Sequence, residues 1–279
     1  MKTLRWRTEI SDFDESGARL RGYSLYDLAT TDAIPFSDLF YLTATGALPT
    51  PEQSAVLSIM LKVTVAQGIS VAGAVTNTIA NSGNPVQVAI SAGLMTIADR
   101  VGGAGEELAR DLQELIPLDM DPATIDDALI LRATNEIYDR YMASHGRVPG
   151  FGHVLHKSGD PRALAVLDGA RRHGFGDGPY IRVLQGLQDR LRDEAGISIQ
   201  PNIDGADAVV LSELKMPWCY ARPIIMLGRM IGLSGISAEN LLHRRSDIPG
   251  AIMDFDYDGV PPRPLPERYR VNTASGEGD

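Results

Sequence analysis

Apolar residues recur at helical spacing along most of the chain, and almost no segment alternates between apolar and polar positions as a half-buried strand would. Only residues 1–22, which are polar and carry a turn at 14–17, are predicted to form a short extended ribbon. The fold class is therefore predicted to be all-α. The predicted helices cover residues 51–67, 85–98, 106–115, 122–145, 161–173, 179–195, 206–216 and 223–245, the last as one or two helices.

Capping signals mark the ends of these helices. Thr50 and Gln53 form a capping box, with a proline at the first helical position between them. Asp121 and the following proline are predicted to begin the long fourth helix. Gly146 and Gly196 are predicted to end two helices, because glycine readily adopts the left-handed conformation of a helix C-terminus.

Composition narrows the class of protein. The 279 residues are 44% hydrophobic and 22% charged, enough for one large domain or two small ones. A net charge of −10 argues against general binding of nucleic acid or of an anionic membrane. We see no signal peptide and no apolar run of the roughly 20 residues that a membrane span needs. The single cysteine, Cys219, is expected to be packed, excludes a disulfide within the chain and fits a reducing cytoplasm.

One stretch, residues 149–162, carries most of the candidate chemistry. It reads as a glycine-rich loop that leads into a helix, with Asp160 as the N-cap. His153, Lys157 and Arg162 fall within ten positions, which suits acid–base chemistry on an anionic substrate. On composition alone, a loop histidine is more often structural, and loop lysines and arginines are usually solvated. The five histidines, at 145, 153, 156, 173 and 243, lack the spacing of a zinc site, so no metal is expected.

Three motifs, in this order along the chain, resemble the signatures of citrate synthases. The first is Leu-Arg-Gly-Tyr-Ser-Leu-Tyr-Asp-Leu-Ala at 20–29, and the match continues over 41–50. The second is Gly-Phe-Gly-His at 150–153, followed by the lysine and the Asp-Pro-Arg described above. The third is Pro-Asn-Ile-Asp-Gly at 201–205. The chain is therefore identified as a member of the citrate synthase superfamily.

This resemblance implies an architecture that the hydrophobic pattern does not show. The family fold has two helical domains, which here would be a large domain from residues 1–103 and 213–279 and a small one from 104–212. The family also forms homodimers through packed helices of the large domain. The helix expected at 85–98 is rich in small residues and would supply such a surface.

The resemblance also implies roles for particular residues. Citrate synthases join the methyl carbon of acetyl-CoA to the ketone of oxaloacetate. Asp204 matches their base for the C–H proton, and His153 matches the group that binds and protonates the ketone oxygen. Arg162 and Arg229 match residues that hold carboxylates, a role that suits the planar guanidinium fork. The remaining matches are Gln67 for the oxoacid and, for CoA, Lys157, Gly150, Phe151 and Gly152.

Simpler interpretations stay open for two of these residues. Asp204 stands at the start of a predicted helix and could be its N-cap, which is a common use of aspartate. Arg229, on an apolar helix, could form a structural ion pair.

Two positions depart from the citrate synthase pattern. The family has a histidine before a Gly-Gly pair that donates to the thioester oxygen, and Val101 stands there in this chain. Loss of one such donor typically costs about 10²–10³ in rate. A backbone N–H beside Gly102 or a bound water could substitute for it. The second departure is Gln67, which aligns near an oxoacid-binding histidine and can donate and accept but cannot become cationic.

The segment 93–103 instead resembles citryl-CoA lyases, especially the citryl-CoA lyase region of ATP-citrate lyase. Those proteins also lack the histidine before Gly-Gly, and they follow the catalytic aspartate with glycine, as Gly205 does here. The leading hypothesis is therefore cleavage of a carboxylated 3-hydroxyacyl-CoA, such as citryl-CoA, with the CoA thioester as substrate and no permanently bound cofactor. The alternatives are condensation of an acyl-CoA with an oxoacid, and a CoA-binding homologue without catalysis.

Overall fold

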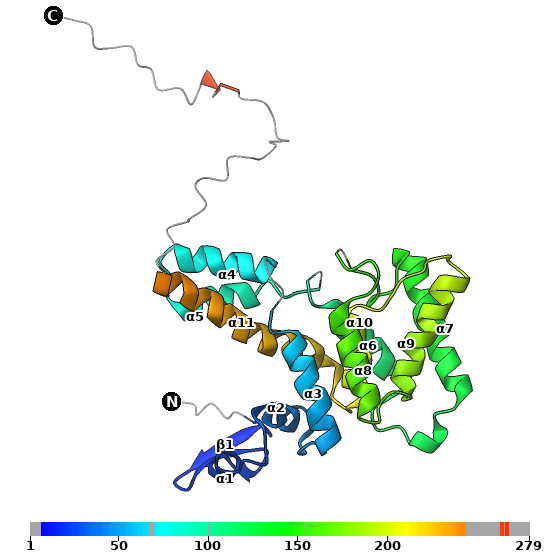
Figure 1. Cartoon of the computed structure of the whole chain (residues 1–279), viewed down its shortest axis with the longest axis horizontal. Helices are drawn as coiled ribbons and strands as arrows, with labels where there is room; N and C mark the ends of the chain where they lie inside the picture. The colour runs from blue at the N-terminus through cyan, green and yellow to red at the C-terminus, as the bar shows by residue number, and fades with distance from the viewer. Residues whose placement is uncertain are drawn as a thin grey trace, which may run out of the picture.

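The computed structural model describes residues 7–66, 70–99, 101–153, 155–243, 263–264 and 266–267. Within this part the chain folds into eleven α-helices and one small sheet, so the all-α prediction is confirmed (Figure 1). No helix among the described residues is long and apolar enough to cross a membrane. Gln67 and most of the tail beyond residue 261 lie outside the described residues, and the predictions made there stay predictions.

The N-terminal ribbon forms as predicted. Strands β1 (Ser11–Asp14), β2 (Gly17–Leu20) and β3 (Tyr23–Ser24) pair antiparallel in sequence order. Two short helices that the hydrophobic pattern did not predict follow the ribbon: α1 (Leu25–Thr30) and α2 (Phe36–Thr45).

The other helices correspond closely to the predicted ones, with three corrections. The capping box at Thr50 is present, but the helix that it begins ends four residues earlier than expected. The helix α4 was missed. The proline at 122 begins only a 3-10 turn, and the long helix starts later, with Asp126 as its N-cap. The elements are α3 (Pro51–Val63), α4 (Val71–Asn81), α5 (Val86–Leu94), α6 (Ala104–Leu115), η1 (Pro122–Thr124), α7 (Asp127–His145), α8 (Pro161–Arg172), α9 (Pro179–Asp193), α10 (Ile203–Glu213), η2 (Trp218–Tyr220) and α11 (Ala221–His243).

Helix α10 lies at the centre of the main core. Its residues from Gly205 to Ser212 are all buried, as expected of a helix surrounded by other elements on every side. It packs against α6, α8 and α9, which lie together with α7 on one side of the molecule (Figure 1). On the other side α4, α5 and α11 pack together, and α3 connects the two groups through its contacts with α8 and α11. The functional motifs therefore meet where the buried helix begins.

Candidate active site

A short run of backbone hydrogen bonds, which we call the backbone clip, joins two of the predicted motifs. Gly152 N–H donates to Gln200 O over 2.9 Å, and Asn202 N–H donates to Gly150 O over 2.9 Å. The Asn202 side chain also donates to Gly152 O over 2.7 Å. Segments separated by about fifty positions in the chain are thereby held side by side, and the loop that carries the histidine is fixed to the start of α10.

Glycines permit this close approach. A Cβ atom on Gly205 would lie only 2.3 Å from the carbonyl oxygen of Gly150, which no real side chain tolerates. Gly150 itself has a φ of +84°, a conformation that residues with a Cβ rarely adopt. The glycine after the predicted catalytic aspartate is thus a packing requirement of the clip.

The carboxylate of Asp160 ties two helix starts together. It accepts hydrogen bonds from the backbone N–H of Arg162 at the start of α8 and from that of Ile203 at the start of α10, over 3.0 and 3.2 Å. It also pairs with the Arg162 guanidinium over 2.8 and 3.0 Å. Burial alone would raise the pKa of Asp160, but the hydrogen bonds from Arg162 outweigh burial and lower it. Sequence reasoning predicted the cap but not the bridge to α10.

His153 receives its orientation from these neighbours. A guanidinium nitrogen of Arg162 lies 3.2 Å from His153 Nε2, and the backbone N–H groups of Leu155 and His156 donate to Nδ1 over 3.1 and 3.2 Å. Burial lowers the pKa of His153; the charge of Asp160 partly opposes this, and the nearby cations add to it. The imidazole is therefore neutral at physiological pH and can accept a proton.

Asp204 is not the N-cap of α10. Asn202 caps the helix, with its side-chain oxygen accepting from Gly205 N–H over 3.1 Å, so that interpretation is wrong. Asp204 stands in the first turn of the helix, half-buried, and its Oδ1 is buried with no hydrogen-bond partner among the described residues. Burial raises the pKa of Asp204 to about 6, with Arg162 lowering it and Asp160 raising it. A carboxyl group in such surroundings can take or give a proton near neutral pH.

A cleft of about 780 Å³ brings the predicted residues together. His153, Arg162, Asp204 and Arg229 all line it. Lys157 does not line the cleft and lies exposed on the loop beyond it. The other three predicted CoA-binding residues, Gly150, Phe151 and Gly152, line the cleft.

Arg229 enters the cleft from α11, where it is only 5% exposed. The preceding Gly228 allows this placement, because a Cβ there would lie 2.0 Å from the Thr64 hydroxyl at the end of α3. Burial, and then the charge of Arg162, lowers the pKa of Arg229. Two guanidinium groups thus face one cleft, as recognition of a substrate with more than one carboxylate requires.

Sequence reasoning missed several cleft residues. Tyr141, His145 and Arg147 come from the end of α7 and from the residues just before the motif loop. His145 and Arg147 are exposed at the rim. Arg147, two positions before the proline that directly precedes the second motif, was the signal in the sequence that could have indicated them.

The structure bears on two other sequence expectations. Val101 forms part of the cleft wall, and its backbone N–H already donates to Ala98 O over 2.8 Å, so that N–H does not replace the missing histidine. Cys219 is exposed rather than packed, because it lies in the 3-10 turn η2 at the surface.

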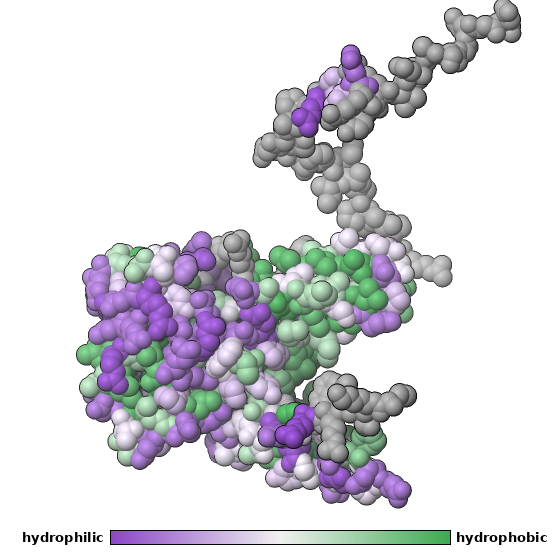
Figure 2. Space-filling model, turned by 180° about the vertical axis from the view of Figure 1, so that it is seen from behind, coloured by the Kyte–Doolittle hydropathy of each residue, from purple (hydrophilic) through white to green (hydrophobic). Residues whose placement is uncertain are grey.

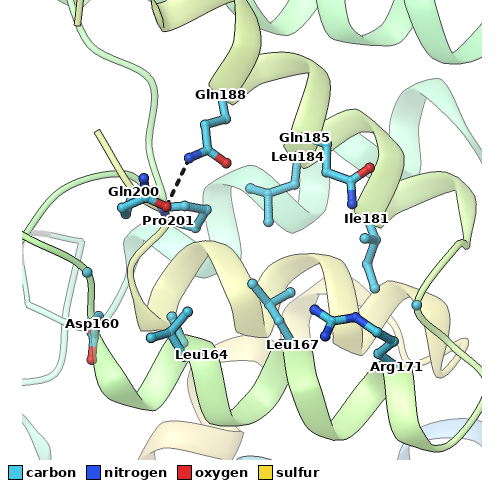
Figure 3. A pocket seen from close by; sticks show the side chains of 13 residues that line it. Asp160, Leu164, Leu167, Arg171, Ile181, Leu184, Gln185, Gln188, Gln200 and Pro201 are labelled. Atoms are coloured by element: carbon cyan, nitrogen blue, oxygen red, sulfur yellow. Dashed lines mark hydrogen bonds between the residues drawn. The ribbon is translucent and has the colours of Figure 1, made fainter. Parts of the chain in front are cut away.

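A second pocket, of about 170 Å³, lies between α8 and α9 (Figure 3). Leucine and isoleucine side chains, such as Leu167 and Leu184, form its walls, and Gln188 donates to Gln200 across one end over 3.0 Å. Neither His153 nor Asp204 lines it. The larger cleft is therefore the candidate active site of this all-α protein.

The chain belongs to the citrate synthase family: residues 55–246 match the family model described as citrate synthase, C-terminal domain. Among curated relatives, the citrate synthase of Helicobacter pylori is 27% identical over 207 residues, which are 71% of this chain and 46% of that protein. The citrate synthase of Deinococcus radiodurans is 27% identical over 200 residues, which are 69% of this chain and 49% of that protein. The chain thus spans about half the length of these relatives.

Solved structures place the fold more closely. The chain is similar to citryl-CoA lyase from Hydrogenobacter thermophilus, with a TM-score of 0.79, 27% identity, and coverage of 94% of this chain and 98% of that one. It also shares the fold of ATP citrate lyase from Methanothrix soehngenii, solved in complex with citrate and coenzyme A, with a TM-score of 0.72, 19% identity, and coverage of 97% of this chain and 44% of that one. The predicted superfamily, with its likeness to citryl-CoA lyases, is confirmed.

Replacement of Asp160 by Asn should destabilise the protein by roughly 3–5 kcal/mol, because asparagine caps a helix well but leaves the largely buried Arg162 charge unpaired. Asp168→Asn, in the same helix, breaks only the exposed pair with Arg171 and should cost less than about 1 kcal/mol. Chemical denaturation measures both. Equal losses in the two variants would contradict the bridging role of Asp160.

Proposed function

We propose that this protein cleaves a carboxylated 3-hydroxyacyl-CoA to acetyl-CoA and an oxoacid, with citryl-CoA giving oxaloacetate as the leading case. The supporting observation is that one cleft gathers a neutral imidazole, a carboxyl group with a raised pKa, and two guanidinium groups. A proton acceptor and a proton donor are what cleavage needs, and the guanidinium groups suit the carboxylates of the substrate.

The proposed reaction is a proton-balanced carbon–carbon cleavage. His153 takes the proton of the substrate hydroxyl, and the electron pair of that O–H bond forms the ketone of the oxoacid. The carbon–carbon bond breaks, and its electron pair moves into the enolate of acetyl-CoA. Asp204 in its protonated form then protonates the enolate carbon. Arg162 and Arg229 hold carboxylates, and Arg162 also orients the imidazole through its 3.2 Å contact.

Cleavage is preferred to condensation on two grounds, the valine at 101 and the similarity to a citryl-CoA lyase over 94% of this chain. The Asp204 carboxyl, with a pKa of about 6, exchanges its proton near neutral pH and can serve either direction. Condensation remains the alternative because microscopic reversibility gives both directions one site, and the curated relatives are named citrate synthases. A CoA-binding protein without catalysis is the third candidate, motivated by the residues at 67 and 101.

The CoA moiety is proposed to lie along the loop of the second motif. Lys157 is exposed beyond the cleft and would contact a CoA phosphate, while the backbone of residues 150–152 would line the thioester arm. Arg147 at the rim would add positive charge. This local basic rim would offset the net charge of −10, which by itself repels an anionic substrate.

Asp204→Asn should abolish turnover while the fold stays intact, because the amide has the same shape but cannot give or take the proton. His153→Ala should also abolish turnover and weaken substrate binding, and the combined loss should be far from additive.

The assay supplies citryl-CoA and, separately, acetyl-CoA with oxoacids, and follows thioester absorbance and free thiol. Acetyl-CoA release without thiol marks the lyase, and thiol release in the second arm marks the synthase. CoA binding with neither would support the third candidate, and an active Asp204→Asn enzyme would refute the mechanism.

The pH profile of cleavage should show a limb set by Asp204. Cleavage requires protonated Asp204, so its kcat/KM should fall as pH rises through about 6, the pKa of that carboxyl. Condensation uses the same pair with the proton on His153 and Asp204 ionised, so by microscopic reversibility its kcat/KM should fall over the same interval. Initial rates in both directions between pH 5 and 8.5 provide the measurement. A cleavage kcat/KM that does not fall above about pH 6 would rule out Asp204 as the titrating group.

We also propose a homodimer and the two-domain division at residues 104 and 212. Exposed apolar side chains gather over α4, α5 and α11, where Figure 2 shows a broad hydrophobic face. A second copy of the chain would cover this face, because monomeric proteins rarely expose large apolar patches. The exposed residues are Val71, Val88, Met95, Met230, Ile231, Leu241 and Leu242.

Sedimentation at micromolar concentration should show a species of twice the 30.1 kDa chain mass. Ile231→Glu should weaken it, because the change places a charge in the apolar face. Leu131→Glu is the control: this residue is equally exposed but lies on α7, away from that face, and the dimer should persist. A single 30.1 kDa species in the unmodified protein would remove the proposal.

A further inference from the structure

A second aspartate of α10, which the proposed mechanism does not use, is buried behind the active site. Asp207 follows Asp204 by one helical turn and is only 1% exposed. Both of its carboxyl oxygens are buried, and neither has a hydrogen-bond partner among the described residues. Burial of a carboxyl group without hydrogen-bond partners costs folding free energy, so the presence of Asp207 here requires an explanation.

The surroundings of Asp207 disfavour a negative charge. The charged groups that act on it are Asp204 in its own helix and the pair of Asp160 and Arg162 at the start of α8. That guanidinium is already engaged by Asp160. Burial, and then the charge of Asp204, raises the pKa of Asp207 well above its ordinary value. These surroundings favour the protonated, neutral form of the side chain.

The other elements packed on α10 bring few polar groups. The side chains that α6 buries are apolar apart from Asp111, which is occupied by Arg140 and Tyr141. Those that α9 buries are apolar apart from Tyr180, whose hydroxyl donates to Ile116 O. The start of α11 contributes Ala221, Ile224 and Ile225.

The two aspartates complement each other. A neutral carboxyl carries an O–H donor, and Asp204 Oδ1 is a buried acceptor that lacks a donor among the described residues. Residues three apart on a helix are neighbours on one face, with Cβ atoms about 5–6 Å apart. Helical side chains also lean toward the N-terminus of the helix, which directs Asp207 toward the turn that holds Asp204.

We propose that Asp207 is a positioning residue that stays protonated, donates its O–H to Asp204 Oδ1 and turns the other oxygen of Asp204 toward the cleft. The proposal rests on the proposed function only in taking Asp204 as the proton-transfer group. Asp207 itself does not line the cleft, so it would act on the substrate only through Asp204. A donor to the ionised form also keeps the pKa of Asp204 from rising further with burial.

Two substitutions distinguish a hydrogen-bond donor at position 207 from a side chain that only fills space. Asp207→Asn keeps an N–H donor without charge, so the pH profile and kcat of cleavage should stay within about two-fold of the unmodified protein. Asp207→Leu keeps the volume and removes the donor. Its kcat should fall about ten-fold, the rate equivalent of one hydrogen bond of about 1.4 kcal/mol, with KM unchanged. The alkaline limb of its cleavage profile should move to higher pH, because the ionised Asp204 loses a donor. Glu213→Gln is the control and should leave the pH profile of cleavage unchanged. Glu213 is a half-buried acid in the same helix and accepts hydrogen bonds from the backbone N–H groups of Tyr180 and Ile181.

A measurement without substrate separates this proposal from the proposed function. In protein labelled with ¹³C only at aspartate carboxyl carbons, the NMR spectrum at pH 7.5 should contain a protonated carboxyl signal that is absent from Asp207→Asn. This NMR signal can be measured even if the protein turns over no CoA thioester, and the comparison requires only that Asp207→Asn folds. Persistence of the signal in Asp207→Asn, its absence from the unmodified protein, or identical cleavage profiles for the Asn and Leu variants would overturn the assignment.

Discussion

The buried carboxylate of Asp160 is the contact on which the rest of the site depends. It accepts from the first turns of two helices that start 42 positions apart, α8 at Pro161 and α10 at Ile203, and it pairs with Arg162. Arg162 in turn contacts His153. The backbone clip adds a second connection between the same two segments. The distance between the imidazole and the carboxyl of Asp204 is therefore set by packed, buried contacts rather than by a free loop.

Burial sets the protonation states in this arrangement. It lowers the pKa of the imidazole, which keeps more of it in the proton-accepting form, and raises that of Asp204, which keeps more of it in the proton-donating form. Opposite shifts of two neighbouring titratable groups are a common way for one site to supply both an acid and a base near neutral pH. Asp160 remains ionised in the same region because Arg162 and two backbone N–H groups satisfy it.

The sequence predicted much of the fold because capping and periodicity are local. The capping box at Thr50 and the loop leading into Asp160 are decided by neighbours within a few positions. The helix α4 was missed because the positions it buries carry small residues, such as Gly73, Thr76 and Ala80, rather than large apolar ones. The start of α7 was misplaced because Asp121 and Asp126 are both good caps, and the first serves only a 3-10 turn.

The site itself was predicted through motifs, and what was missed depends on tertiary contacts. No local signal shows that Asp160 reaches Ile203, or that Asn202 rather than Asp204 caps α10. Likewise, Asp207 reads as an ordinary helical aspartate until its burial is known.

The most direct test of the central claim is to incubate the protein with citryl-CoA in D₂O and analyse the acetyl-CoA by mass spectrometry. If an exchangeable acid in the cleft protonates the enolate, each acetyl-CoA should carry one deuterium in its methyl group, with an equal amount of oxaloacetate and no free CoA. Release of free CoA and citrate, or acetyl-CoA without deuterium, would contradict the account.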